Sequence, residues 1–298
     1  MKIIHGEGFN NRERIAFRNI IYRNVISDIK VLIENYYKFH SEPLQKQIET
    51  TIDEVSNLDF NIKIDKEISE KILTIWKNEK IQQIFQNYEK FNIPESSEYF
   101  FNKISEIDID NYLPSDEDIL LCRVQTTGVN QIKFESKGYN FTLIDVGGQR
   151  NERRKWINHF ENILSVLFVT SLSEYNQKLY EDESINRMHE SILLFEQISN
   201  NQYFHKSPII LFLNKVDLFK RKIAKYPLTI AFPNYTGGNT FEEASQYIEK
   251  KIKKKRKKSK SSIYCHYTCA TNTKNVKFVF NAIQDIILQQ ILPQMGIL

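Results

Sequence analysis

The chain has 298 residues, 41% of them hydrophobic and 12% aromatic, which is a globular composition and excludes a disordered or collagen-like protein. The sequence contains no stretch of about 18 apolar residues, so no membrane span is predicted. The first residues contain no apolar signal region. The formal net charge of +4 would become −5 without the nine positive charges of segment 250–260 (KKIKKKRKKSK), so the basicity is local and does not imply a general nucleic-acid-binding surface.

The first part of the chain is predicted to be helical. Residues 12–39 carry apolar side chains three and four positions apart, which form one face of a helix. Residues 44–112 are polar with scattered apolar residues and few alternating patterns, which predicts several short helices, with Pro94 and Pro114 as interruptions. We therefore expect a helical module over about 10–117.

The pattern changes after residue 118, where apolar runs of strand length alternate with helical segments. The predicted strands are Phe141–Val146, Leu164–Thr170, Pro208–Leu213 and Tyr264–Tyr267, with helices over 184–199 and near the end of the chain. Continuous apolar runs alternating with helices are typical of an α/β fold, in which a mostly parallel sheet is covered by helices on both faces.

Three motifs follow predicted strands and contain residues suited to nucleotide chemistry. The first is Asp145-Val146-Gly147-Gly148-Gln149, where a carboxylate at a strand end suits Mg²⁺ beside phosphates and an amide can orient water. Taken alone, it is more typical of a strand followed by a glycine turn. The second motif is Asn214-Lys215-Val216-Asp217, in which a carboxylate can accept two hydrogen bonds from guanine, and a solvated turn is an equal alternative. The third is Thr268-Cys269-Ala270-Thr271, which is uninformative by itself.

The cysteines and histidines predict no metal site. Cys122, Cys265 and Cys269 fit neither a disulfide framework nor a zinc-binding spacing, so we expect reduced thiols.

Together, and in this order, the three motifs resemble those of the guanine-nucleotide-binding proteins. Segment 121–128 (LCRVQTTG) resembles the first switch of heterotrimeric G-protein α subunits, and 145–156 (DVGGQRNERRKW) resembles their second switch. The closing FVFNAIQDIIL is similar to their C-terminal helix. The resemblance covers almost the whole chain and implies a P-loop-GTPase-like α/β domain with an inserted all-α helical domain.

The resemblance also implies roles for individual residues. Arg123 would stabilise charge on the transferring phosphoryl group and Gln149 would position the hydrolytic water, while Thr126 and Asp145 would bind Mg²⁺. The ligand would be GTP or GDP. Further nucleotide contacts are implied for Leu121, Cys122, Val124, Gln125, Thr127, Val146, Gly147, Gly148, Asn214, Lys215, Val216, Asp217, Cys269 and Ala270.

One family motif does not occur in this sequence. The phosphate-binding loop, G-x-x-x-x-G-K-S/T, is absent, because Gly6 and Gly8 are not followed by Gly-Lys-Ser. We expect residues 1–9 to be the remnant of the first GTPase-domain helix, 10–117 the helical domain and 118–298 the Ras-like GTPase domain. The first strand of that domain and the phosphate loop are expected to be missing.

Partners and localisation follow from the same resemblance. It implies binding to a βγ dimer, to a G-protein-coupled receptor through the C-terminal helix 276–298, and to an effector, with no nucleic acid. The expected localisation is cytoplasmic, with a peripheral position at the inner face of the plasma membrane as the alternative.

Three functional hypotheses stay open. The first is a signal transducer downstream of receptors that binds and hydrolyses GTP. The second is a non-catalytic α-subunit-like interaction protein, which binds receptor, βγ or effector without a nucleotide cycle. The third is an anionic-membrane or nucleic-acid binder acting through residues 250–260, against the simpler interpretation of that run as a solvated charged segment.

Overall fold

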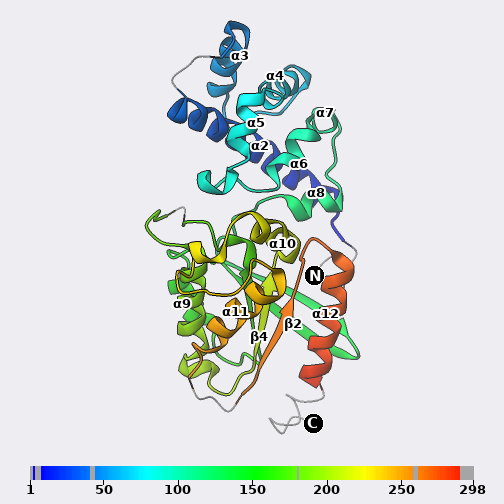
Figure 1. Cartoon of the computed structure of the whole chain (residues 1–298). Coiled ribbons are helices and arrows are strands. Elements are labelled where there is room, and N and C mark those ends of the chain that lie inside the picture. The colour runs from blue at the N-terminus through cyan, green and yellow to red at the C-terminus, as the bar shows by residue number, and fades with distance from the viewer. Residues whose placement is uncertain (1–2, 4–7, 41–43, 180, 258–260, 289–298) are drawn as a thin grey trace. The chain divides into compact units, whose positions relative to one another are not determined.

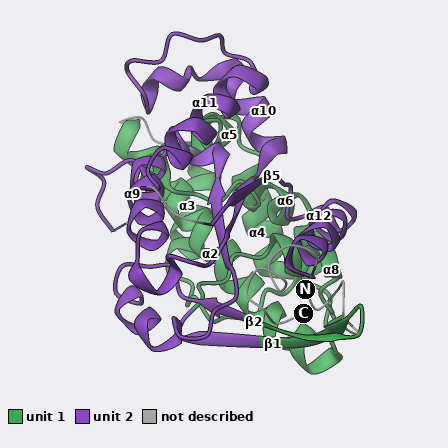
Figure 2. Cartoon of the chain, turned by 90° about the horizontal axis from the view of Figure 1, so that it is seen from below, with its two compact units in different colours: residues 1–126, 132–143 green, residues 127–131, 144–298 purple. Residues whose placement is uncertain are grey.

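The computed structural model describes residues 3, 8–40, 44–179, 181–257 and 261–288, and these residues form two compact units (Figure 2). Unit 1 comprises Met1–Thr126 and Ile132–Leu143, and unit 2 comprises Thr127–Gln131 and Ile144–Leu298. The predicted remnant helix at 1–9 and the end of the predicted C-terminal helix lie largely outside the described residues.

The predicted first helix is confirmed as α2 (Asn11–Phe39). It begins with a capping box, in which the side chain of Asn10 accepts from the backbone N–H of Glu13 and the side chain of Glu13 accepts from that of Asn10. One face of α2 is buried from Ile21 to Tyr36 because apolar residues recur there every three or four positions.

The predicted short helices after residue 44 are also confirmed, and they pack with α2 around one hydrophobic core. That core contains Ile29, Tyr36 and Phe101, none of which is exposed. The elements are α3 (Lys46–Ser56), α4 (Lys66–Trp76), α5 (Glu79–Phe85), η1 (Tyr88–Phe91), α6 (Ser97–Asn102), α7 (Ile104–Ile107) and α8 (Asp116–Leu121).

A two-stranded hairpin follows, and its first strand was not predicted. Strands β1 (Val129–Ser136) and β2 (Tyr139–Val146) pair with each other and are joined by Lys137 and Gly138. Both joining residues have positive φ angles, of 54° and 76°, as in the type I′ turn that connects antiparallel strands. The alternation Ile132-Lys133-Phe134-Glu135 before Gly138 is the signal that predicts β1.

The other predicted strands form a separate parallel sheet in the order β3-β4-β5. They are β3 (Val166–Ser171), β4 (Ile209–Asn214) and β5 (Ile263–Tyr267). In the register, Val166 lies beside Ile209, and Ile209 lies beside Ile263. All three strands therefore end at the same edge of the sheet, where α/β folds place their ligands.

Helices cover both faces of the parallel sheet, as predicted. Leu211 and Leu213 point to the larger core, which also contains Phe195 and Ile248, whereas Ile210 points to the opposite face. Figure 1 shows α9 and α11 on one side and α12 on the other. The helical elements of unit 2 are η2 (Arg153–His159), η3 (Leu172–Glu174), α9 (Arg187–Ser199), η4 (Gln202–Phe204), α10 (Val216–Lys225), η5 (Leu228–Ile230), α11 (Phe241–Lys253) and α12 (Thr273–Ile286).

The two sheets do not share a strand. Among the described residues, β3 is hydrogen-bonded as a strand only to β4, and β2 only to β1. Val169 of the edge strand β3 lies on the same face as Leu167 and is 54% exposed.

Candidate functional site

Asn214 joins two of the predicted motifs at the carboxyl ends of β4 and β5. Its side-chain oxygen accepts one hydrogen bond from the hydroxyl of Thr268 and one from the backbone N–H of Ala270, both at 3.0 Å. The backbone N–H of Thr268 donates to Leu213, and its carbonyl accepts from Val216. The two loops are thereby held as one rigid unit, although they lie more than fifty residues apart in sequence.

Lys215 is held in a strained backbone conformation at the start of α10. Its φ of 59° lies in the left-handed region, which a residue with a side chain seldom adopts. Its ammonium group lies 3.4 Å from Oε1 of Glu174, in η3. The turn therefore directs the chain from β4 into α10, and the ion pair holds the ammonium group of Lys215 beside η3.

Asp217 lies in the first turn of α10, and its carboxylate is available to a ligand. The residue is exposed, and no hydrogen bond or ion pair to its side chain is found within the described residues. An aspartate is favoured in this turn by the helix dipole, which is the structural alternative to a ligand-binding role.

The loop after β5 is fixed by residues that the motif search did not single out. The backbone N–H of Cys269 donates to Oδ1 of Asn275, which in turn donates its own N–H to Asn272 at the start of α12. Thr268 is 1% exposed, so its role is in holding the loop. Ala270 is an exposed residue beside Asn214, where the sequence motif predicted a contact to the base.

The Asp145–Gln149 segment leaves β2 at its carboxyl end. Asp145 is exposed, yet burial by the surrounding protein raises the pKa of its carboxyl, partly offset by the backbone hydrogen bond of Val146. Gly147 is buried and held by the carbonyl of Gly128 and by the indole of Trp156. A Cβ on Gly148 would meet nothing within 4 Å, so packing inside the chain does not require glycine there.

The segment after Gln149 is clamped to α9 by a buried carboxylate. Glu190 receives two hydrogen bonds from Arg150, at 3.2 and 2.7 Å, and one from Arg153 at 2.7 Å. Its carboxylate is 8% exposed, and the hydrogen bonds from Arg150, opposed by burial, lower its pKa. Sequence reasoning missed Glu190, because nothing in the local pattern of α9 indicates which residue faces the arginines.

The Leu121–Thr126 segment belongs to unit 1, where it follows α8. The amide of Asn24 donates to the carbonyl of Arg123 at 2.8 Å and anchors the segment to α2. Cys122 is buried, which raises the pKa of its thiol to about 12 and makes a reactive thiolate unfavourable. The side chains of Arg123, Val124 and Gln125 are exposed.

A partly buried carboxylate on α2, that of Asp28, lies within electrostatic range of Arg123. Burial raises the pKa of Asp28 to about 6, against the lowering effects of a hydrogen bond from Ser97 and the charge of Arg123. The folded chain therefore binds this proton more tightly than the unfolded chain. The free energy of unfolding should fall as the pH rises from about 4 to about 6 and stay lower above that.

We expect Asp28→Asn to stabilise unit 1 at pH 7 by about 1–3 kcal/mol, because it removes a buried charge and keeps the acceptor for Ser97. Denaturant unfolding at pH 5 and pH 7.5 measures the effect, which should be larger at the higher pH. Asp53→Asn, at an exposed position of α3, is the matched control. Destabilisation by Asp28→Asn at both pH values would show instead that attraction to Arg123 outweighs burial.

The residues proposed as Mg²⁺ ligands have suitable chemistry. Thr126 offers a hydroxyl and Asp145 an exposed carboxylate, and both are the hard oxygen donors that Mg²⁺ prefers. The described residues contain no group of three or more His, Cys, Asp or Glu side chains able to hold a metal. Mg²⁺ usually takes only one or two protein ligands, with phosphate oxygens and water completing its shell.

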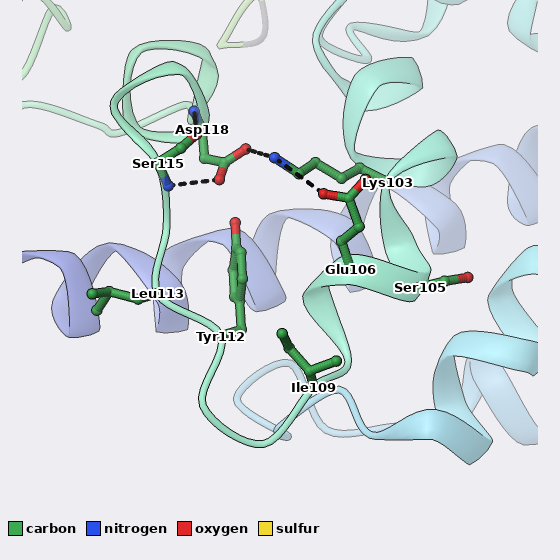
Figure 3. Close-up of a pocket in the computed structure, with 8 residues that line it drawn as sticks. All are labelled: Lys103, Ser105, Glu106, Ile109, Tyr112, Leu113, Ser115 and Asp118. Carbon is green, nitrogen blue, oxygen red and sulfur yellow. Dashed lines mark hydrogen bonds and ion pairs between the residues drawn. The ribbon is translucent and has the colours of Figure 1, made fainter.

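A cavity of about 400 Å³ occurs in unit 1, and none of the predicted nucleotide contacts lines it. Figure 3 shows Lys103 between the carboxylates of Asp118 and Glu106, with the hydroxyl of Tyr112 pointing toward Asp118. The Tyr112 hydroxyl is buried and makes no hydrogen bond within the described residues. Burial is the main reason that its pKa is raised.

No helix among the described residues is both long and apolar enough to cross a membrane.

Comparison with known proteins places these features in context. A family model described as G-protein alpha subunit matches residues 1–287. The guanine nucleotide-binding protein G(o) subunit alpha of Lymnaea stagnalis is 38% identical over 301 residues, which cover 100% of this chain and 85% of the relative. The same subunit of Caenorhabditis elegans gives the same values. The guanine nucleotide-binding protein alpha-4 subunit of Caenorhabditis briggsae is 39% identical over 316 residues, covering 100% of this chain and 86% of the relative.

Proposed function

Because this chain belongs to the G-protein α-subunit family, we propose that it binds GTP and GDP and transmits signals from a G-protein-coupled receptor to an effector. The observation that carries the proposal is the pair of loops joined by Asn214. At the carboxyl edge of the parallel sheet, these loops carry the exposed residues Asp217 and Ala270.

Guanine recognition follows from the chemistry of these groups. The carboxylate of Asp217 can accept from both N1–H and the 2-amino group of guanine, and adenine has no such pair of donors. The backbone N–H of Ala270 is engaged by Asn214, so it can offer the guanine O6 only a shared hydrogen bond. Since Lys215 is fixed by its left-handed turn, its stem can pack along the purine ring.

Phosphate chemistry is proposed for the segments that resemble the family's two switches. Gln149 orients the attacking water, and Arg123 stabilises the negative charge that develops on the transferring phosphoryl group. Mg²⁺, held by Thr126 and Asp145, would neutralise phosphate charge. The open space around Gly148 supports a role for its backbone N–H toward the terminal phosphate.

We assign the nucleotide-dependent conformational change to segment 150–153, whose arginines are hydrogen-bonded to Glu190. The two arginine contacts tie 150–153 to α9, so a change at Gly148 or Gln149 on nucleotide exchange can be passed to the surface around η2. That surface and the C-terminal helix are the proposed contacts for the βγ dimer, effector and receptor. Residues 289–298, where the sequence predicted the end of that helix, lie outside the described residues.

The test is thermal unfolding of the chain with Mg²⁺ and a non-hydrolysable GTP analogue, against the matching ATP analogue. A ligand that binds only the folded state stabilises it by about 2.7 kcal/mol at a hundredfold excess over its dissociation constant. We expect the GTP analogue alone to raise the melting temperature. A cooperative transition that ignores both nucleotides, together with retained binding of a βγ dimer, would favour the non-catalytic interaction protein instead.

A further inference from the structure

The C-terminal end of α11 and the loop before β4 carry exposed lysines, which we call the basic patch. Its members are Lys206, Lys250, Lys251, Lys254 and Lys257. None of the five forms an ion pair with a carboxylate among the described residues. The two acidic side chains beside the patch, Glu249 and Glu196, are already paired with Lys253 and Lys255.

Helix capping explains only part of this charge. Lysines in the last turn of a helix are stabilised by the helix dipole, but that effect disappears within one turn. The helix α11 ends at Lys253, whereas basic residues continue in the sequence to Lys260. The helix dipole therefore does not explain the basic residues that follow Lys253.

The backbone that carries the patch is held in place by two side chains. The amide of Asn200 donates to the carbonyl of Lys255 and accepts from the N–H of Lys257, at 3.0 and 2.8 Å. The guanidinium of Arg256 donates to the carbonyls of Ser207 and Ser262, both at 3.2 Å. These contacts bring Lys206 beside the end of α11 and fix the lysines as one surface.

The kind of charge indicates the kind of partner. Segment 250–260 has eight lysines and one arginine, and the arginine is used in the contacts to Ser207 and Ser262. No free guanidinium remains within 250–257 for two-pronged recognition of a single phosphate. No aromatic residue lies within 250–260 on which a nucleic-acid base can stack. Lysine ammonium groups that act as separate point charges suit a surface of diffuse negative charge.

We propose that the basic patch docks this chain on an anionic membrane surface. Each lysine near such a surface strengthens binding by about fivefold, so the patch gives a reversible, salt-sensitive attachment. The patch lies at the amino edge of the parallel sheet, because Ser207 and Ser262 precede β4 and β5. It is therefore at the opposite edge from Asn214 and Asp217, and membrane docking leaves the proposed guanine site accessible.

The experiment measures co-sedimentation of the full chain with two kinds of vesicle. One is pure phosphatidylcholine, and the other is phosphatidylcholine with about 30% phosphatidylserine. We expect binding only to the anionic vesicles, and its loss when salt is raised from about 0.1 to about 1 M, since the screening length falls from about 10 to about 3 Å. Equal binding to both kinds of vesicle would overturn the proposal.

The decisive variant is K250Q/K251Q/K254Q/K257Q, for which we expect vesicle binding to fall by about a hundredfold or more. Its matched control is K46Q/K66Q/K77Q/K90Q, which removes the same charge from exposed lysines of unit 1 that have no ion pair within the described residues. Should the first variant fail to fold, K254Q/K257Q alters only positions beyond α11 and should lower binding by about 25-fold. Equal loss in the patch and control variants, or tighter binding to duplex DNA than to the vesicles, would refute membrane docking.

Discussion

Replacing Asp217 by asparagine is expected to lower the affinity of the chain for GTP by at least about a hundredfold. This prediction rests on the proposed function. The carboxylate can accept from two guanine donors, whereas the amide of asparagine has one acceptor and places its own N–H₂ against the second donor. The charge-assisted bond is lost, and a guanine N–H is left unpaired. Titration calorimetry with a non-hydrolysable GTP analogue measures the change.

The chemistry also predicts a compensating ligand for Asp217→Asn. Xanthine carries a carbonyl in place of the 2-amino group, so the asparagine amide can donate to it while still accepting from N1–H. Affinity for a xanthine nucleotide should therefore rise as affinity for GTP falls. Glu242→Gln, at another exposed acid in the first turn of a helix, is the control and should change neither. Unchanged GTP binding in Asp217→Asn would place the base elsewhere.

Replacing Asp118 by alanine is expected to destabilise unit 1 by about 3–5 kcal/mol. The carboxylate of Asp118 is 1% exposed and accepts from Tyr99 at 2.7 Å, Lys103 at 2.9 Å and the backbone N–H of Ser115 at 2.7 Å. The substitution leaves these donors without their acceptor and removes the capping box of α8. Denaturant unfolding, followed by a probe in unit 1, measures the loss.

Glu117→Ala is the matched control, because Glu117 is exposed in the same helical turn. It should change the free energy of unfolding by less than about 0.5 kcal/mol. Similar losses in both variants would mean that the helix, and not the buried carboxylate, supplies the stability.

The same carboxylate predicts how stability depends on pH in acid. Burial opposes ionisation of Asp118, but hydrogen bonds from Lys103, Tyr99 and Ser115 outweigh it and lower the pKa to about 2. Ionised Asp118 therefore stabilises the folded state above pH 4, and this contribution is lost as the pH falls toward 2. Asp118→Ala should lack this part of the acid dependence.

Much of the candidate site was accessible from the sequence, for a physical reason. Asn214 ends β4 and Ala270 lies shortly after β5, and parallel strands end at a common edge of the sheet. Asp145 lies near the end of β2, a predicted strand that belongs to the separate hairpin. The part that could not be predicted consists of contacts between distant segments. The order of residues alone did not show that Asn214 holds Thr268 and Ala270, or that Glu190 holds two arginines.

The sequence by itself determined most of the helices and strands and which of their faces are buried. The three-to-four spacing of apolar residues predicted α2, and apolar runs predicted β3 and β4, because the periodicity of a segment reflects which side must leave water. Apolar and polar residues also alternate in β1, although this strand was not among those predicted.

Only the tertiary structure decided which polar groups meet and how the strands are grouped. It separated β1 and β2 from the parallel sheet, enclosed the carboxylates of Asp28 and Asp118, and fixed the lysines after α11 in one surface. These outcomes depend on hydrogen bonds and burial between residues far apart in the chain, and a local pattern carries no information about a distant partner. The chemistry of each motif is therefore encoded locally, whereas its geometry and its charges are set by the fold.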